Sequence, residues 1–276
     1  LIDPFGGAAD LAARQLRVLH PLSFVEDPTR ILRGARLAGR LGFHFERGTL
    51  SQARAALDPR FLGNVSRSRL RAELEITLDE PRVAPALSVL CELHGLEAMF
   101  GLPRAEGRLD PLKLTAALDA LREAGPVPTE AYLLALFVGV PVADLEKHVE
   151  EFNWPRRHLA TLARLHKALD PGLRPTHEGR PEPLRDEDLE ALEPAARLLL
   201  RVIDPELGLR VERIESGTPR RRLRGSDVVG LGVLPGPRVG RVLDEVARAR
   251  AEHEVATFEE ELDLARRLVK AQGNAG

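Results

Sequence analysis

The feature that most constrains this chain is the regular return of Ala, Leu, Arg and Glu at the spacing of an α-helix. Aromatic residues make up only 4% of the 276 residues, and runs of β-branched residues are rare. Apolar side chains that recur every three or four residues form one face of a helix. The sequence therefore predicts a mostly α fold whose core is built by packing helices.

Glycine, proline and acidic residues divide this helical pattern into segments. Proline cannot continue a helix and glycine commonly ends one, so such sites predict helix boundaries. Thr129, in "GPVPTE", is the predicted N-cap of one helix, and residues 170–188 read as a proline-rich, charged linker. Residues 1–22 are the exception, since "DPFGGAADL" is rich in turns and "LRVL" (16–19) is a candidate edge strand. The predicted breaks lie at Gly42, Asp58-Pro59, Asp79-Glu80-Pro81 and Gly101-Leu102-Pro103.

Charge and cysteine content exclude several classes of protein. The net charge is only −2, so any surface for nucleic acid must be a local patch of arginine. A single cysteine, Cys91, cannot pair within the chain, and no Cys/His cluster has metal-ligand spacing. We expect a reducing cytoplasm and no membrane partner, since no signal peptide or spanning apolar run is found. The start at Leu1, inside "LIDPFGG", suggests that an N-terminal part is missing.

The stretch "EDPTRILRGARLAGRLGF" (26–43) predicts a helix with an acidic start and an arginine face. Asp27 can cap the helix, and Pro28 fits its first turn. Ile31, Gly34, Ala35, Ala38 and Leu41 share one stripe, whereas Arg33, Arg36 and Arg40 lie opposite, with Arg30 at the edge. Gly34 suggests that another backbone or a ligand comes close there. The face is either solvated or set against phosphates or carboxylates, because arginines without interleaved acids repel one another.

Four stretches together resemble the class II (bacterial-type) tRNA nucleotidyltransferases and their poly(A) polymerase relatives. "DPFGGAADL" (3–11) is similar to the hinge motif, and residues 26–43 are similar to the nucleotide-selecting EDxxR motif and its helix. "SRSRLRAEL" (66–74) resembles the ERxxxE-type motif, although Ser68 stands where the family usually has Glu. "GSDVVGLGVLPGPRVGRVLDEV" (225–246) resembles a segment of the C-terminal body and tail. The four span nearly the whole chain in family order.

The resemblance implies that Asp27 and Arg30 act as a protein template for the base. An ionised Asp accepts from an exocyclic amine, and Arg donates from a rigid fork, so the pair would accept C or A and refuse G and U. Arg33 would be the next nucleotide-binding arginine, and Glu26 would orient Arg30.

Other residues have predicted roles near this template or in binding tRNA. Asp3, Gly6, Gly7 and Asp10 would form the hinge. Arg69 and Glu73, spaced as an intrahelical ion pair, would buttress the nucleotide-binding helix. The predicted tRNA contacts are Arg36, Arg40, Arg220, Arg221, Arg222 and Arg224.

The family's catalytic carboxylates, which hold Mg²⁺, are not found in this sequence. The resemblance therefore implies no catalytic or metal residue in this chain, with Mg²⁺ held by a missing head domain. We expect the fragment alone to be inactive. The predicted division is residues 1–22 as a head remnant and hinge, 23–124 as neck, 125–205 as helical body and 206–276 as tRNA-binding tail.

The function expected of the full-length protein is addition of all or part of CCA to tRNA from CTP and ATP without a nucleic-acid template. A poly(A) polymerase of the same family and a stand-alone helical RNA-binding module are the alternatives. The sequence leaves open which of CCA, CC or A is added, the oligomeric state, and whether the fragment folds or binds tRNA alone.

Overall fold

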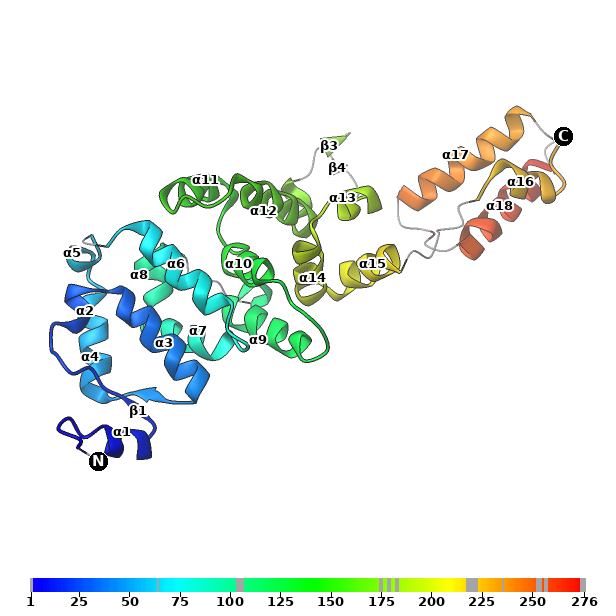
Figure 1. The fold of residues 1–276 in the computed structure, drawn as a ribbon. Helices are drawn as coiled ribbons and strands as arrows, with labels where there is room; N and C mark the ends of the chain where they lie inside the picture. The colour runs from blue at the N-terminus through cyan, green and yellow to red at the C-terminus, as the bar shows by residue number, and fades with distance from the viewer. Residues whose placement is uncertain are drawn as a thin grey trace. The chain divides into compact units, whose positions relative to one another are not determined.

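The computed structural model describes residues 2–63, 65–102, 107–173, 176–177, 180–181, 184–216, 223–234, 236–251, 255 and 258–273. Helices make up most of this described part, and its strands are short (Figure 1). The prediction of a mostly α fold is confirmed. Within the described ranges, none of the helices combines the length and the apolar character needed to cross a lipid bilayer.

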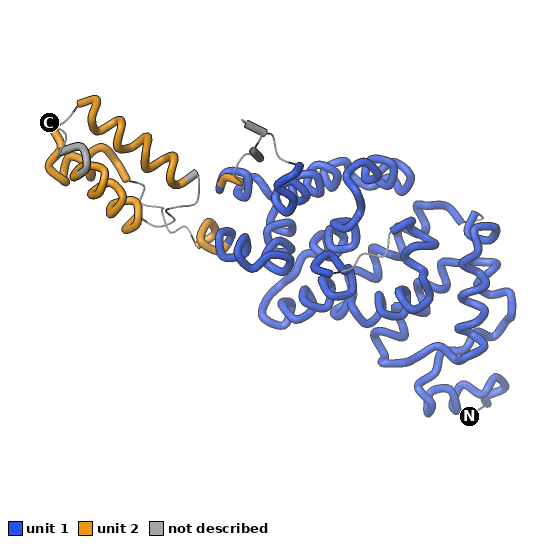
Figure 2. Tube along the Cα trace, turned by 180° about the vertical axis from the view of Figure 1, so that it is seen from behind, with its two compact units in different colours: residues 1–174, 186–211 blue, residues 175–185, 212–276 orange. Residues whose placement is uncertain are grey.

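The chain divides into two compact units (Figure 2). Unit 1 comprises residues 1–174 and 186–211, and unit 2 comprises residues 175–185 and 212–276. The finer division into head remnant, neck, body and tail stays a prediction.

Unit 1 is a stack of helices with one two-stranded sheet. Its elements are α1 (Gly7–Ala12), β1 (Gln15–Leu16), α2 (Ser23–Glu26), α3 (Thr29–Leu41), β2 (His44–Phe45), α4 (Arg47–Ala56), α5 (Pro59–Leu62), α6 (Arg67–Leu78), α7 (Ala84–Glu92), α8 (Gly95–Phe100), the 3-10 turns η1 (Gly107–Leu109) and η2 (Pro171–Leu173), α9 (Pro111–Arg122), α10 (Thr129–Phe137), α11 (Val142–Glu151), α12 (Arg156–Leu169), α13 (Asp186–Glu190), α14 (Pro194–Ile203) and most of α15 (Pro205–Glu215).

Helix α3 lies at the centre of the first half of unit 1. Its buried stripe of Ile31, Leu32, Ala35 and Ala38 packs against α6 and α7. Gly39 allows α3 and α7 to approach closely, because a Cβ there would lie only 2.5 Å from the backbone nitrogen of Ala86. Ile31, Ala35 and Ala38 of the predicted apolar stripe thus lie on the core face, whereas Leu41, at the end of the helix, is exposed and Leu32 joins the core instead.

A parallel pairing of β1 with β2 ties the N-terminal segment to the end of α3. Gln15 lies opposite His44, and Leu16 lies opposite Phe45. The strand predicted over residues 16–19 therefore begins one residue earlier and ends at Leu16. The Phe45 ring packs on Gly34, where a Cβ would lie 2.7 Å from it. The group that comes close at Gly34 is therefore a side chain, and not the backbone or ligand that the sequence suggested.

A buried carboxylate, that of Asp119, links α7, α9 and α10 of unit 1. Asp119, in α9, accepts the backbone N–H groups of Val83 and Ala84 and the hydroxyl of Tyr132 in α10. Burial and the hydrogen bond to Asp119 raise the pKa of Tyr132 far above its usual range. These bonds hold the start of α7 against α9 and α10.

Unit 2 has a core of its own, formed by α16 (Gly225–Gly230), α17 (Pro237–Ala251) and α18 (Phe258–Gly273). Leu223, Val228, Val242 and Val246 are buried in it. Glu261 is buried too, and its carboxylate accepts from the backbone N–H of Leu223 and from Arg250. Unit 2 also holds the antiparallel pair β3 (Thr176–His177) and β4 (Arg180–Pro181), inside the stretch predicted to be a linker.

Most predicted helix boundaries agree with the structure. Helix α3 ends at Gly42 in the left-handed region, Asp58 caps α5, and Gly101 follows α8. The prediction that Thr129 is an N-cap is wrong, because Pro128 holds that position. Thr129 is the first residue of α10, and its hydroxyl donates to Asp79 at 3.0 Å.

Candidate functional site

Asp27 connects α2 to α3 in an extended conformation that points its carboxylate along the start of α3. Its Oδ1 accepts the backbone N–H of Thr29 at 3.1 Å and the hydroxyl of Thr29 at 2.6 Å. Thr29 itself is buried. Asp27 therefore satisfies one of the free N–H groups of the first turn, as its place in the sequence predicts.

The second oxygen of Asp27 has a different partner. Oδ2 accepts from Nη2 of Arg69, in α6, at 2.9 Å. Burial raises the pKa of Asp27, but the hydrogen bonds from Thr29 and Arg69 outweigh it and hold that pKa below its ordinary value. A carboxylate offers about four acceptor positions. Two on Oδ1 and one on Oδ2 are filled, so an ionised Asp27 retains one open acceptor position on Oδ2.

Arg30 lies one turn further along α3 with 44% of its side chain exposed. Its Nη1 donates to the hydroxyl and to the carbonyl oxygen of Ser23, at 2.9 and 3.0 Å. The same nitrogen lies 3.6 Å from a carboxylate oxygen of Glu26. The contact predicted between Glu26 and Arg30 is present, although Ser23 provides the closer partners.

The remaining arginines of α3 meet acidic residues from other elements. Arg33 pairs with Glu73 of α6 at 3.4 Å. Arg36 and Arg40 both approach one oxygen of Glu80, at 3.2 and 3.6 Å. Glu80 is only 8% exposed, and Arg36 only 19%. The self-repulsion inferred from the sequence is thus relieved by acids that α3 does not contain.

Arg69 and Glu73 do not serve as the intrahelical pair that their spacing suggested. Arg69 reaches Asp27, and Glu73 reaches Arg33. Both contacts cross from α6 to the α2–α3 segment. The two residues therefore contact two of the predicted nucleotide-binding side chains, Asp27 and Arg33.

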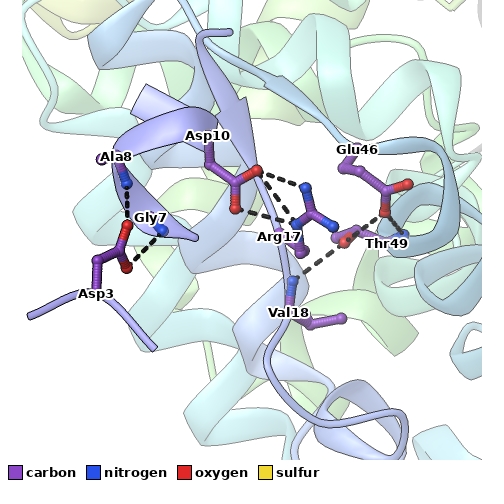
Figure 3. A network of polar contacts seen from close by, with 8 residues as sticks. All are labelled: Asp3, Gly7, Ala8, Asp10, Arg17, Val18, Glu46 and Thr49. Atoms are coloured by element: carbon purple, nitrogen blue, oxygen red, sulfur yellow. Dashed lines mark hydrogen bonds and ion pairs between the residues drawn. The ribbon is translucent and has the colours of Figure 1, made fainter. Parts of the chain in front are cut away.

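The N-terminal segment that carries the predicted hinge is a short helix closed by two carboxylates (Figure 3). Asp3 accepts the N–H groups of Ala8 and Gly7, both at 2.8 Å, and these bonds lower its pKa. Gly6 adopts a left-handed conformation, with φ of 74°. Asp10 receives a two-pronged bond from Arg17, with 2.6 Å for the shortest contact. Beside it, the hydroxyl of Thr49 accepts the backbone N–H of Val18, and Glu46 accepts the backbone N–H of Thr49.

The predicted basic run is only partly within the described residues. Arg220, Arg221 and Arg222 lie outside them. Arg224 is exposed just before α16, and its backbone N–H donates to the carboxylate of Asp227 at 2.8 Å.

A groove of about 500 Å³ lies elsewhere in unit 1, among α6, α10 and the start of α12. Ile76, Leu133 and Pro155 line it together with Arg71 and His158. It contains none of the predicted site residues.

The chain is similar to several known proteins. No family model matches the chain. A CC-adding tRNA nucleotidyltransferase of Deinococcus radiodurans is 34% identical over 279 residues, which cover 100% of this chain and 61% of the relative. An A-adding tRNA nucleotidyltransferase of Geobacter sulfurreducens is 30% identical over 291 residues, covering 97% of this chain and 32% of the relative.

A solved structure is also similar. It is a tRNA nucleotidyltransferase complexed with a primer tRNA and an incoming ATP analogue. The identity is 28%, the TM-score is 0.58, and the match covers 78% of this chain and 66% of that one. Over nearly its whole length the chain is similar to tRNA nucleotidyltransferases. It spans less than two thirds of the length of the relatives named here.

Three residues at this site were not predicted from the sequence. Ser23 holds Arg30, Thr29 holds Asp27, and Glu80 receives Arg36 and Arg40. Thr29 could have been found as the second residue after a capping Asp. Ser23 and Glu80 gave no signal, because their contacts depend on how α2 and the end of α6 pack beside α3.

Proposed function

We propose that the full-length protein adds all or part of the 3′-terminal CCA to tRNA, using CTP and ATP and no nucleic-acid template. This chain would select the base and hold the tRNA. The observation that carries the proposal is the placement of Asp27 and Arg30 three positions apart at the start of α3, each held by other residues. The pKa of Asp27 is lowered, so its carboxylate is ionised, and the described residues leave one acceptor position on it open. Arg30 is exposed, and among the described residues its side chain is held through Nη1 alone.

This pair has the hydrogen-bonding pattern that reads cytosine and adenine. Both bases place an amino donor beside a ring nitrogen that accepts. A carboxylate accepts from the amine, and a guanidinium donates to the ring nitrogen. Guanine and uracil place a carbonyl beside a ring N–H at the corresponding edge, which would oppose acceptor to acceptor and donor to donor. The same two side chains would therefore admit C and A and refuse G and U.

The names of the relatives support the substrates. They include CC-adding and A-adding enzymes and a complex with primer tRNA and an ATP analogue. In this proposal Arg33 supports the nucleotide beside Arg30. Arg40 and the run Arg220–Arg222 with Arg224 contact tRNA phosphates. Arg36 was also predicted to contact phosphates, but it is mostly buried and pairs with Glu80, so we assign it a structural role instead.

The proposal assigns parts of the chain to parts of the task. Residues 1–22 would carry the hinge, with Asp3 and Asp10 closing its helix around Gly6 and Gly7. Residues 23–124 would select the nucleotide, 125–205 would form the body, and 206–276 would hold tRNA. The cytoplasm is the proposed place of work, in keeping with a single cysteine that cannot form a disulfide within the chain.

The resemblance also implies Mg²⁺. Among the described residues, no three His, Cys, Asp or Glu side chains come together in a way that could hold a metal ion. The described residues therefore do not fit the metal, and we derive no step through it. We assign Mg²⁺ to carboxylates of the full-length protein outside this chain, so the chain by itself would not catalyse nucleotide transfer.

The experiment offers the full-length protein tRNAs that end before C, after C and after CC, with Mg²⁺ and each nucleoside triphosphate in turn. Addition of CTP followed by ATP is expected of a CCA enzyme. Addition of CTP alone would indicate a CC-adding enzyme, and ATP onto the CC end alone an A-adding one. Long A tails would indicate a poly(A) polymerase, and no extension would favour an RNA-binding module.

Arg30→Ala tests the template directly. Loss of the guanidinium should lower the ratio of kcat/KM for CTP over UTP by about 100-fold, since two hydrogen bonds from a charged donor are removed. The affinity for tRNA should change by less than about twofold, because Arg30 is not among the proposed phosphate contacts. Arg156→Ala, at an exposed position in α12, is the matched control. Unchanged nucleotide choice in Arg30→Ala would refute the template.

A further inference from the structure

Ser23 makes both of the closest contacts to Arg30. Its hydroxyl and its carbonyl oxygen lie 2.9 and 3.0 Å from Nη1 of Arg30. The carbonyl also accepts the backbone N–H of Asp27 at 3.3 Å. One residue at the start of α2 therefore touches both members of the template, although it precedes them by four and seven positions.

These contacts all use one end of the guanidinium. Nη1 donates to Ser23 and faces Glu26, whereas Nε and Nη2 of Arg30 have no hydrogen bond to any described residue. A guanidinium presents its donors as a planar fork, so fixing one nitrogen fixes the direction of the remaining edge. The edge formed by Nε and Nη2 is the one left for a ligand.

Holding that edge in place matters because Arg30 is long and largely exposed. A free arginine side chain loses about 2 kcal/mol of rotamer entropy when a ligand fixes it. The contacts to Ser23 fix the Arg30 side chain before a ligand binds, so this entropy is already lost in the folded protein and does not weaken binding. The hydroxyl adds a second acceptor to a carbonyl that already serves Asp27.

We propose that Ser23 is a positioning residue for base selection, which holds Arg30 by Nη1 so that its Nε and Nη2 read the incoming base. This inference rests on the function proposed above. Thr29 makes the corresponding contact to Asp27, with its hydroxyl 2.6 Å from Oδ1. A hydroxyl thus fixes each half of the template.

The test uses the full-length protein and measures kcat and KM for CTP, ATP and UTP. Ser23→Ala removes the hydroxyl and should lower the CTP-over-UTP ratio of kcat/KM by about tenfold, the factor that corresponds to one hydrogen bond to a charged group. Ser23→Thr keeps the hydroxyl and should stay within about twofold of the wild type. Ser88→Ala, at an exposed position in α7, is the matched control.

Two further readouts separate positioning from a purely structural role. Destabilisation would lower the rates with all nucleotides alike and would lower the melting temperature without changing the ratio. In the background of Arg30→Ala, Ser23→Ala should have no further effect on selectivity, because it acts through Arg30. An unchanged ratio in Ser23→Ala, or an equal further loss in the double variant, would overturn the inference. A wild-type protein that adds no nucleotide would instead refute the proposed function.

Discussion

Asp27 shows how one carboxylate combines two tasks at the scale of a single residue. Oδ1 accepts the backbone N–H of Thr29 at the start of α3, and Oδ2 accepts a hydrogen bond from Arg69 in α6. Only 18% of the Asp27 side chain is exposed, whereas 56% of the Arg69 side chain is, so the bonds to Thr29 are better shielded from water than the bond to Arg69. Because the donors are a neutral hydroxyl, a backbone N–H and a guanidinium, all of them favour the ionised form.

This environment predicts a stability that depends on pH. The pKa of Asp27 is lower in the folded chain than its ordinary value of 3.8. A depressed pKa means that the ionised Asp27 stabilises the fold above pH 3.8, and that this contribution fades as the pH falls below it. Asp27→Asn should lower the free energy of unfolding of the chain by about 1–2 kcal/mol at pH 7, and by less at pH 3.

Urea denaturation of the chain at several pH values checks this. Asp244→Asn, at an exposed position in α17, is the control and should change stability little at any pH. A loss in Asp27→Asn that is equally large at pH 3 and pH 7 would contradict the role of the charge.

The sequence indicated Asp27 and Arg30 as the proposed template, but it revealed only some of the residues that contact them in the structure. The capping of α3 by Asp27 follows from contacts two residues apart, which local rules describe well. The partners Arg69 and Glu80 lie 40 or more positions away from the residues of the α2–α3 segment that they contact, so only the packing of α6 beside α3 reveals them. For the same reason the arginine face looked unpaired in the sequence.

At the scale of the elements, the helices follow their local signals and the contacts between them follow close packing. Asp58 and Gly42 bound their helices as predicted. Thr129 is not the N-cap because Pro128 holds that position, and the hydroxyl of Thr129 donates instead to Asp79, in the turn after α6. A side chain that could cap a helix can bind a tertiary partner instead, and the sequence does not show that partner.

The crossing of α3 and α7 depends on a glycine that sequence analysis did not single out. A Cβ at Gly39 would lie 2.5 Å from the nitrogen and 2.9 Å from the Cα of Ala86, which are backbone atoms that cannot turn aside. Gly39→Ala should therefore force the helices apart and destabilise unit 1 by about 1–3 kcal/mol.

Gly240 provides the opposite case. It lies within α17, and nothing stands within 4 Å of a Cβ built there. Gly240→Ala should stabilise unit 2 by up to about 1 kcal/mol, because alanine has the higher helix propensity. Urea denaturation of both variants gives the signs, and a neutral or stabilising Gly39→Ala would show that the two helices can separate freely.

At the scale of the whole molecule, the proposed tasks fall in different units. Asp27 and Arg30 lie in unit 1, which has its own buried stripe along α3. Arg224 lies in unit 2, beside a separate core around Val228 and Val242. Since each unit has its own core, a surface change in one should leave the fold of the other intact.

This separation predicts two distinct kinds of variant in the full-length protein. Arg224→Gln should weaken tRNA binding for every tRNA alike, and should reduce the slope of log affinity against log salt by about 1, since one phosphate contact is lost. It should leave the CTP-over-UTP ratio unchanged, whereas Arg30→Ala does the reverse. Filter binding over a range of salt, with Arg156→Gln as the matched exposed arginine, measures the slope. A slope that Arg224→Gln does not change would remove Arg224 from the phosphate contacts. A changed nucleotide ratio would mean that unit 2 takes part in selecting the base.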